Sequence, residues 1–250
     1  TQRPRFSLGL NALGSDAEGL RALVRQPALA GIEQLAFAGI YLDEGAARAF
    51  AASPFTRELT GLTISDKDLS MECVRAFLAA PFARSLRHLA LDRYVGDIGD
   101  LLDVLDGGPL ESLELLHDEL GPRTAAVLGR IRLPQLTRLS LSYNEILGDD
   151  GCAHVVGNPS FGNVRVLEFL GTGAGLRTAH ALIGNNALTA LDTVRLGGEV
   201  PDAAAQVLEG AAKLRRVQRL QLVGVSDQAI EALARSLDLT YGVTNKLLAA

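Results

Sequence analysis

Tryptophan is absent from this 250-residue chain, and aromatic residues make up only 5% of it. Because large aromatic side chains are so scarce, Leu, Ala and Val must supply most of the core volume. Apolar residues reach 48%, which is enough to bury a core as one domain or as one continuous array. A core of this composition is typical of a periodic fold built from thin layers.

Cysteines and long apolar runs are also scarce. Cys73 and Cys152 lie far apart and match no metal-binding or redox spacing. So few thiols favour a reducing environment, and a cytoplasmic location is therefore expected. No stretch reaches the roughly 18 apolar residues of a membrane span, and the N-terminus lacks the apolar core of a signal peptide. The missing initial methionine predicts a processed form or an excised piece.

Positive charge is in short supply, with 24 Lys and Arg against 29 Asp and Glu and a formal net charge of −5. This balance argues against sequence-independent binding to nucleic acid or to an anionic membrane. The basic residues cluster at one place, Lys213, Arg215, Arg216 and Arg219. On an acidic chain we interpret this cluster as a solvated loop, so neither nucleic acid nor membrane is expected as a partner.

A short apolar pattern recurs along the chain, as in LTGLTI from Leu59, LRHLAL from Leu86 and LTRLSL from Leu136. Its copies begin near residues 5, 32, 59, 86, 110, 136, 164, 191 and 217, at steps of 24 to 28 residues. A period of about 20–29 residues is typical of a solenoid. The sequence therefore predicts one array over residues 1–238, followed by a C-terminal tail, 239–250, that is a candidate partial cap.

Each unit combines a short strand with a helix. In L-x-x-L-x-L the last two apolar residues alternate with another residue, so both face the same side of a strand. Apolar residues spaced three or four apart then predict helices at 43–52, 71–80, 149–157, 202–212 and 227–237. Ser226 and Asp227 are suited to cap the last of these helices. Prolines such as Pro54 and Pro81 mark the loops that lead to the next strand.

Repetition of this unit predicts an α/β fold in which all strands run in one direction. Strands are narrower than helices, so the stacked units must curve. We expect a right-handed solenoid shaped like a horseshoe, with a concave parallel sheet, convex helices and about nine repeats. No unit can close its own leucine layer, because the units before and after it supply the missing contacts.

The segment LTRLSLSYNEILGDDGCAHVV, residues 136–156, resembles a leucine-rich repeat of the ribonuclease-inhibitor type over almost its whole length. Linkers such as AASPFTREL (51–59) and NPSFGNV (158–164) are similar to those of bacterial arrays in this family. The resemblance covers about residues 5–238 and implies the horseshoe fold. It also implies that the side chain of Asn144 hydrogen-bonds backbone groups from unit to unit.

The other units depart from the family at this asparagine position. Tyr94, Thr172 and Val225 are among the residues that replace it. An interrupted asparagine ladder leaves backbone groups to water or to other side chains, so less uniform turns are expected after the strands.

The strand positions that do not face the core are expected to point to the concave side. They are mostly small and uncharged in the first three units, whereas charged and apolar side chains are mixed from His88 onward. Charged groups around exposed apolar ones are typical of a protein-binding surface. The candidate contact residues are Asp92, Glu114, Leu116, Arg138, Tyr143, Glu168, Leu170 and Arg195. The alternative is a solvated sheet on which Glu168 and Arg195 merely pair across strands.

Catalytic interpretations of this face are weak. Glu114 and Glu168 are expected two strands apart, near the outer range for the carboxylates of an inverting glycosidase, but no deep cleft is implied. His88 is expected beside Ser112, yet Asp92 lies too far along the strand to orient the imidazole as in a hydrolase triad.

Metal and phosphate sites are equally weak interpretations. His154 and His180 fall on helices of different units, so a metal site is not expected. The glycine-rich segment GTGAG, residues 171–175, lacks the Lys-Ser/Thr of a phosphate-binding loop and is interpreted as a widened turn.

We therefore expect a non-catalytic scaffold whose concave face binds an unidentified protein, without a cofactor. The alternative is a structural or regulatory segment of a larger multidomain protein that contacts its own domains, and an enzyme is the third possibility. Neither end shows a recognisable capping module, so the strand at 5–10 would leave an open edge. Extra chain, a partner or self-association could cover that edge.

Overall fold

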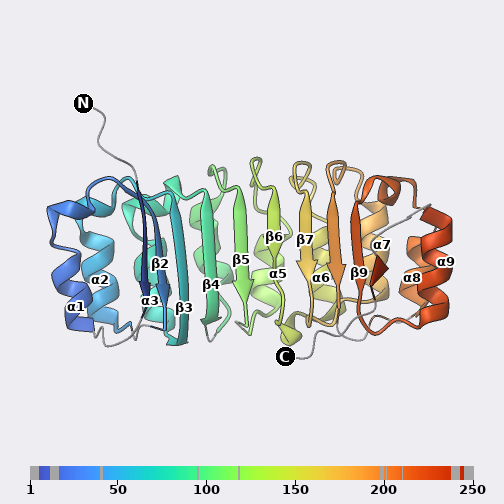
Figure 1. The fold of residues 1–250 in the computed structure, drawn as a ribbon, viewed down its shortest axis with the longest axis horizontal. Helices are drawn as coiled ribbons and strands as arrows, with labels where there is room; N and C mark the ends of the chain where they lie inside the picture. The colour runs from blue at the N-terminus through green and yellow to red at the C-terminus, as the bar shows by residue number, and fades with distance from the viewer. Residues whose placement is uncertain are drawn as a thin grey trace.

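A single parallel sheet runs through the computed structural model, which describes residues 6–11, 17–39, 42–94, 96–117, 119–197, 200, 202–209, 211–237 and 243–244. Its strands lie side by side in chain order (Figure 1). They are β1 Phe6–Asn11, β2 Ile32–Ala38, β3 Gly61–Leu69, β4 His88–Tyr94, β5 Ser112–Leu116, β6 Arg138–Ser140, β7 Val166–Phe169, β8 Thr193–Leu196, β9 Arg219–Leu222 and β10 Val243–Thr244.

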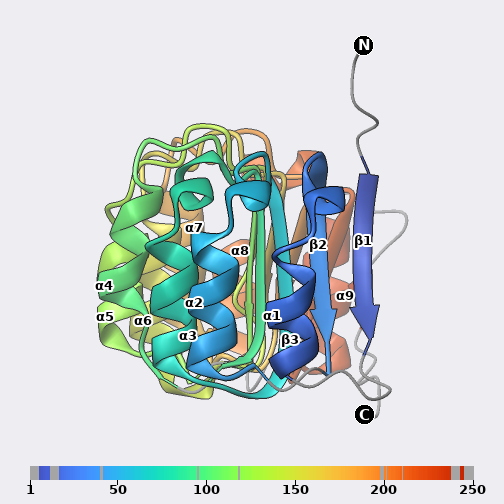
Figure 2. The same ribbon diagram turned by 90° about the vertical axis from the view of Figure 1, so that its left-hand side faces the viewer.

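Helices cover one face of this sheet (Figure 1). They are α1 Ala17–Leu23, α2 Glu44–Ala52, α3 Met71–Leu78, α4 Gly99–Leu102, α5 Pro122–Leu128, α6 Gly148–Val156, α7 Leu176–Gly184, α8 Asp202–Leu208 and α9 Asp227–Leu237. In Figure 2 the middle helices α4 and α5 lie on the left, whereas α1 and α9 from the two ends lie towards β1 on the right. The layers therefore form an arc with helices outside and the sheet inside, as the sequence predicted.

All five helices predicted from the apolar spacing are present, and two of them end at least two residues early. Helix α3 ends at Leu78 because Pro81 follows, and the residue before a proline is disfavoured in the helical region. Ala80 accordingly has an extended backbone, with ψ at 151°. Helix α8 ends at Leu208, where the N–H of Glu209 is shared between the carbonyls of Ala205 and Gln206 and the chain tightens.

Side chains close the first turns of several helices, as expected from the sequence. The N–H of Ala229 donates to Ser226 Oγ at 3.3 Å, which confirms the predicted cap of α9. Asp43 Oδ1 accepts from the N–H of Ala46 at the start of α2. The predicted proline loops contain short 3₁₀ helices, η2 Pro54–Thr56 and η3 Pro81–Ser85, each with its proline in the first turn, where the missing N–H matters least.

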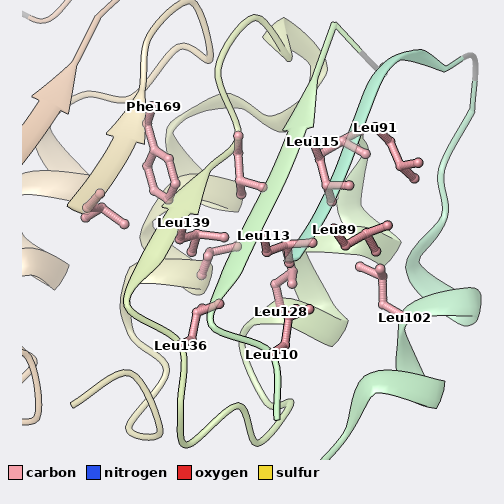
Figure 3. Close-up of a cluster of buried hydrophobic side chains, with 14 of the residues drawn as sticks. Leu89, Leu91, Leu102, Leu110, Leu113, Leu115, Leu128, Leu136, Leu139 and Phe169 are labelled. Carbon is pink, nitrogen blue, oxygen red and sulfur yellow. The ribbon is translucent and has the colours of Figure 1, made fainter. Parts of the chain in front are cut away.

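Equivalent leucines stand in register on neighbouring strands. Leu89 pairs with Leu113, Leu113 with Leu139 and Leu139 with Leu167 along the sheet. The leucines that lead into these strands, Leu110 and Leu136 among them, are at most 1% exposed. Figure 3 shows Leu110 next to Leu136, with Leu113 and Leu139 above them. Each layer is therefore closed by its two neighbours, which is the arrangement that the repeat predicted.

Asn144 is fully buried and joins two units. Its Nδ2 donates to the carbonyls of Leu115, in the preceding unit, and Leu141, at 2.9 and 2.8 Å. Its Oδ1 accepts from the N–H of Leu120 at 3.2 Å. At the equivalent position Thr172 is also buried, but its shorter side chain bonds to backbone groups of its own unit, Phe169 O and Ala174 N, and its contact with the preceding unit is to the Cys152 thiol. The expected interruption of the asparagine ladder is thus observed between these two units.

A second set of amides links the units at the opposite ends of the helices. Asn158 Nδ2 donates to the carbonyls of Leu128 and Ile131, and Asn185 Nδ2 donates to those of Val156 and Asn158. These bonds satisfy carbonyls that a helix leaves unpaired at its C-terminus.

Aspartates near the starts of α4, α6 and α8 cap the next helix rather than only their own. Asp97 accepts from the N–H groups of Arg123 and Thr124, which begin α5. Asp149 does the same for α7, and Asp202 accepts from the N–H and Oγ of Ser226 before α9. Within the described residues, these interunit caps join α4 to α5, α6 to α7 and α8 to α9.

The sheet has two different ends. In the described residues β1 is bonded to β2 alone, as expected for an open N-terminal edge. At the other end, Val243 and Thr244 of the predicted tail pair with Leu220 and Gln221 of β9. Among the described residues, no helix combines the length and the hydropathy needed to cross a membrane.

Replacing Leu139 with Ala should lower the free energy of unfolding by about 2–5 kcal/mol, because the cavity lies between two other layers. Chemical denaturation followed by circular dichroism measures this change. Gln135→Ala, at an exposed position nearby, is the matched control and should leave the midpoint almost unchanged. Equal midpoints for Leu139→Ala and the unmodified protein would contradict the mutual dependence of the layers.

Ionisation of Asp149 should make the free energy of unfolding depend on pH. Burial opposes its ionisation, but hydrogen bonds from the Thr178 hydroxyl and from the N–H groups of Arg177, Thr178 and Gly175 outweigh it and lower its pKa. A lowered folded-state pKa gives stabilisation that is complete above the unfolded value of about 3.9 and is lost as pH falls through the folded value. Asp149→Asn should therefore destabilise by about 1–2 kcal/mol at pH 7 and by progressively less below about pH 4.

Asp150→Asn is the matched control for this titration, since the Asp150 side chain is 75% exposed and pairs only with Arg177 among the described residues. Unfolding midpoints measured between about pH 2 and 7 for both variants separate the two cases. A constant difference between Asp149→Asn and the unmodified protein across that range would show that the carboxylate is not the stabilising species.

Candidate functional site

Four of the candidate residues form one chain of ion pairs across the concave side of the sheet, which we name the charge ladder: Glu114, Arg138, Glu168 and Arg195. Arg138 Nε lies 3.1 Å from Glu114 Oε1, and its Nη2 lies 2.7 Å from Glu168 Oε2. Arg195 Nη1 completes the ladder at 2.8 Å from Glu168 Oε1. Two acids and two bases from β5, β6, β7 and β8 thus cancel in charge.

Strand register explains why this ladder can form. Glu114, Ser140 and Glu168 are register partners on three neighbouring strands. Arg138 lies two residues before Ser140 on β6, the strand between the two glutamates. Ser140 is small and 3% exposed, so the longer Arg138 side chain reaches both carboxylates across it. Glu168 lies at the buried centre of the ladder with its side chain 7% exposed, whereas the side chains of the other three members are 31–39% exposed. Ion pairs held in this way lose little further side-chain freedom when a partner binds.

Apolar side chains lie beside the ladder. Leu116 and Leu170 are partly buried, at the ends of β5 and β7. A Cβ at Gly197 would lie 2.8 Å from Leu170 Cδ2 and 3.1 Å from Val223 Cβ. Gly197 therefore leaves the space into which Leu170 and Val223 pack from the two neighbouring units, and the candidate face combines polar and apolar surface.

The remaining candidates, Asp92 and Tyr143, meet through a residue that the sequence did not indicate. Asp92 Oδ2 accepts from Ser65 Oγ at 2.8 Å, and its Oδ1 lies 3.0 Å from His117 Nδ1. The His117 ring in turn stacks on Tyr143, with centroids 4.4 Å apart and planes at 1°. We name Asp92, His117 and Tyr143 the edge cluster. Tyr143 lies in the turn after β6 and not on the strand, so the cluster lies at the edge of the sheet where the strands end.

The backbone of the edge cluster explains how these rings are presented. The residue two positions after the last core-facing residue of the strand is glycine in several units, with φ of 63° at Gly39, after Phe37, and 62° at Gly171, after Phe169. Arg93, His117 and Tyr143 occupy the same position in three consecutive units, with φ of 65°, 56° and 65°. A side chain in this left-handed region costs about 1–3 kcal/mol. The recurrent glycines were the sequence signal by which His117 could have been noticed.

The catalytic alternatives lose ground in the structure. Glu114 and Glu168 are not separated by an open cleft, because both form ion pairs with Arg138, which lies between them. In GTGAG the N–H of Gly175 donates to Asp149 Oδ1, as do the neighbouring amides at the start of α7, so a carboxylate already occupies the position a phosphate would take. Within the described residues, no group of three or more His, Cys, Asp or Glu side chains is arranged to hold a metal ion.

Both cysteines are buried and unreactive in character. Burial raises the pKa of the Cys152 thiol to about 12, and its Sγ lies 3.3 Å from Thr172 Oγ1. Cys73 is buried between α3 and the residues before α2, where its Sγ lies 3.3 Å from the carbonyl oxygen of Leu42. These thiols belong to the packing of the units and form no nucleophilic site.

A polar cleft of about 570 Å³ opens at the opposite edge, where β6, β7 and β8 begin. Arg165 and Asp192 form an ion pair of 2.5 Å within it, and Arg216 lies at its rim. None of the predicted contact residues lines this cleft. The candidate residues are therefore gathered on the sheet face and at the far ends of the strands.

The arrangement defines a repeat solenoid whose inner face carries an ordered polar ladder. No protein-family model matches the chain, and a search of curated proteins finds no similar sequence. Among solved structures, the chain is similar to one chain in the crystal structure of the Rad7 and Elc1 complex in yeast, with a TM-score of 0.54 and 14% sequence identity. The match covers 97% of this chain and 78% of that chain. At this identity the likeness concerns the fold, and it agrees with a repeat solenoid.

The strain at the strand ends can be measured at Arg93, whose side chain is exposed. Arg93→Gly should be more stable than Arg93→Ala by about 1 kcal/mol, because alanine keeps the left-handed strain that glycine avoids. Both variants remove the guanidinium, so the comparison isolates the backbone. Thermal or denaturant unfolding of the pair is the measurement, and an Ala variant as stable as the Gly variant would refute the strain.

Proposed function

We propose that the chain is a non-catalytic scaffold that binds another protein through the concave face of a leucine-rich repeat array of the ribonuclease-inhibitor type. The array would span residues 1–238 in nine right-handed units, since parallel strand–helix–strand connections are almost always right-handed. The pairing of Val243 and Thr244 with β9 supports a partial cap in the tail at 239–250. The interunit bonds of Asn144 support the repeat type.

The charge ladder is the observation that carries this proposal. Its four side chains are ordered before any partner arrives, so binding would cost little additional side-chain entropy. Arg195 Nε is buried and, within the described residues, has no hydrogen-bond partner, which leaves one donor of the ladder unused. Beside the ladder, Leu116 and Leu170 offer apolar area. Fixed charges next to apolar side chains favour recognition of one complementary protein surface.

The similar yeast structure supports a protein partner, because it is described as a complex of two proteins. A cytoplasmic location is supported by two cysteines that are buried without a disulfide. A bacterial origin rests only on the linker segments, such as 51–59.

Among the described residues β1 pairs with β2 alone, which favours a second candidate, in which the array is a structural or regulatory segment of a larger protein. An exposed edge strand offers unpaired N–H and C=O groups to any additional strand. Chain outside these residues, a partner or a second copy could supply it. The concave face would then contact a domain of the same protein.

Binding through the ladder is tested by the triple variant Glu114→Gln, Arg138→Gln and Glu168→Gln. Loss of buried, paired charges at an interface costs about 2–5 kcal/mol, so capture of the partner from host lysate should fall at least about 30-fold. Mass spectrometry of the captured proteins is the measurement, with circular dichroism to show that the fold is kept.

The matched control is the triple variant Glu44→Gln, Glu72→Gln and Arg75→Gln, which removes two acids and one base from exposed positions on α2 and α3. Capture by this control should equal that of the unmodified protein. If the ladder variant also retains the partner, the binding site lies elsewhere on the array.

A further inference from the structure

The exposed large apolar side chains of the described residues do not lie on the sheet. They are Tyr143, Ile146 and Leu176, with exposed fractions of 52%, 59% and 37%. Tyr143 and Ile146 follow β6, and Leu176 is the first residue of α7, after β7. The arrows of β5 and β7 in Figure 1 point to the lower edge of the array. The three residues come shortly after the ends of β6 and β7 along the chain, so they belong to the edge at which the strands end. We name this surface, with His117, the strand-end surface.

The strand-end surface is held rigidly. Tyr143 stacks on His117 on one side, and on the other a Cβ at Gly171 would lie 3.1 Å from Tyr143 Cδ1. The N–H of Tyr143 donates to Leu170 O at 2.5 Å, and the next residue is the buried Asn144 that joins two units. A ring fixed in this way needs no reordering on binding, which is the property of an anchor residue.

Backbone strain gives an independent reason to assign a role to these rings. Gly39, Gly171 and Gly224 show that the turn can be made by glycine without a side chain. His117 and Tyr143 keep the turn at positive φ although their rings add nothing to the core. Strain kept at exposed positions is a feature of ligand-contacting sites.

The charge around Tyr143 indicates which partner would fit. Glu119 and Glu145 are exposed, and neither has an ion-pair partner among the described residues. Asp150 is neutralised by Arg177. Arg93 supplies a positive charge, but it lies in the unit before that of His117 and is therefore two units away from Tyr143. The rim nearest the apolar side chains is therefore negative.

We propose that the strand-end surface docks a basic, extended segment of a partner protein. An apolar side chain of the segment packs against Tyr143 and Ile146, and a lysine or arginine beside it pairs with Glu119 or Glu145. This inference rests on the proposed protein-binding function and extends its contact area from the charge ladder to the strand ends. A basic partner also agrees with the net charge of −5 on the chain.

The experiment is selection of a random twelve-residue peptide library, displayed on phage, against the purified protein. The enriched peptides are expected to combine Lys or Arg with Leu or an aromatic residue. Synthetic versions are then titrated by fluorescence anisotropy. The double variant Tyr143→Ala and Ile146→Ala should weaken binding at least tenfold, and Glu119→Gln with Glu145→Gln should weaken it and reduce its salt dependence. Gln135→Ala with Gln218→Ala, at the opposite edge, is the control and should bind normally.

Three results would overturn the inference. The first is enrichment of no peptide, or of acidic peptides. The second is binding that survives the Tyr143 and Ile146 double variant but is lost in the charge-ladder triple variant, in which case the proposed function stands and only its extension to the strand ends fails. The third is binding that neither variant weakens, which would remove both sites. Unchanged unfolding midpoints confirm that each variant is folded.

Discussion

Registration between neighbouring units is the constraint on which the rest of the structure depends. Leu113, Leu139 and Leu167 must stand opposite one another, because each apolar layer is covered only by the layers beside it. The same register places the exposed residues of each strand in rows. Glu114 and Glu168 are two strands apart because their leucine neighbours are, and Arg138 can therefore reach both. The packing of the core leucines thus sets the positions of the exposed side chains on the concave face, although the leucines themselves are buried.

Two surfaces of different physical character result. On the sheet, opposite charges satisfy one another, and Glu168 is almost withdrawn from solvent. At the strand ends, His117 and Tyr143 are held outward by a backbone conformation that glycine adopts in other units. The charge ladder balances two acids with two bases, whereas Glu119 and Glu145 beside Tyr143 are exposed and have no ion-pair partner among the described residues. Both are preorganised, one by ion pairs and the other by the turn.

The periodic features were accessible from the sequence, since leucine spacing determines register and the apolar period determines the helices. The role of Asn144 was accessible for the same reason, through its place in the repeat. The pairing within the ladder was only partly predictable from the sequence. The solvated-sheet interpretation paired Glu168 with Arg195 but did not include Arg138. Arg138 reaches both carboxylates because the residue between them, Ser140, is small. His117 was missed, because its importance comes from a left-handed turn and from a ring on another unit. Side-chain reach is not a periodic property, and the glycines that mark the left-handed turn in other units are absent from the units of His117 and Tyr143.

The aspartate caps give the array a grouping that the leucine pattern does not show. Asp97 ties α4 to α5, Asp149 ties α6 to α7 and Asp202 ties α8 to the start of α9. By this measure the modular element from α4 onward is a doublet rather than a single repeat. Removing one repeat would leave an aspartate without the helix whose N–H groups donate to it, whereas removing a whole doublet would leave the hydrogen bonding intact. Changes in the length of such an array are therefore least disruptive in even steps.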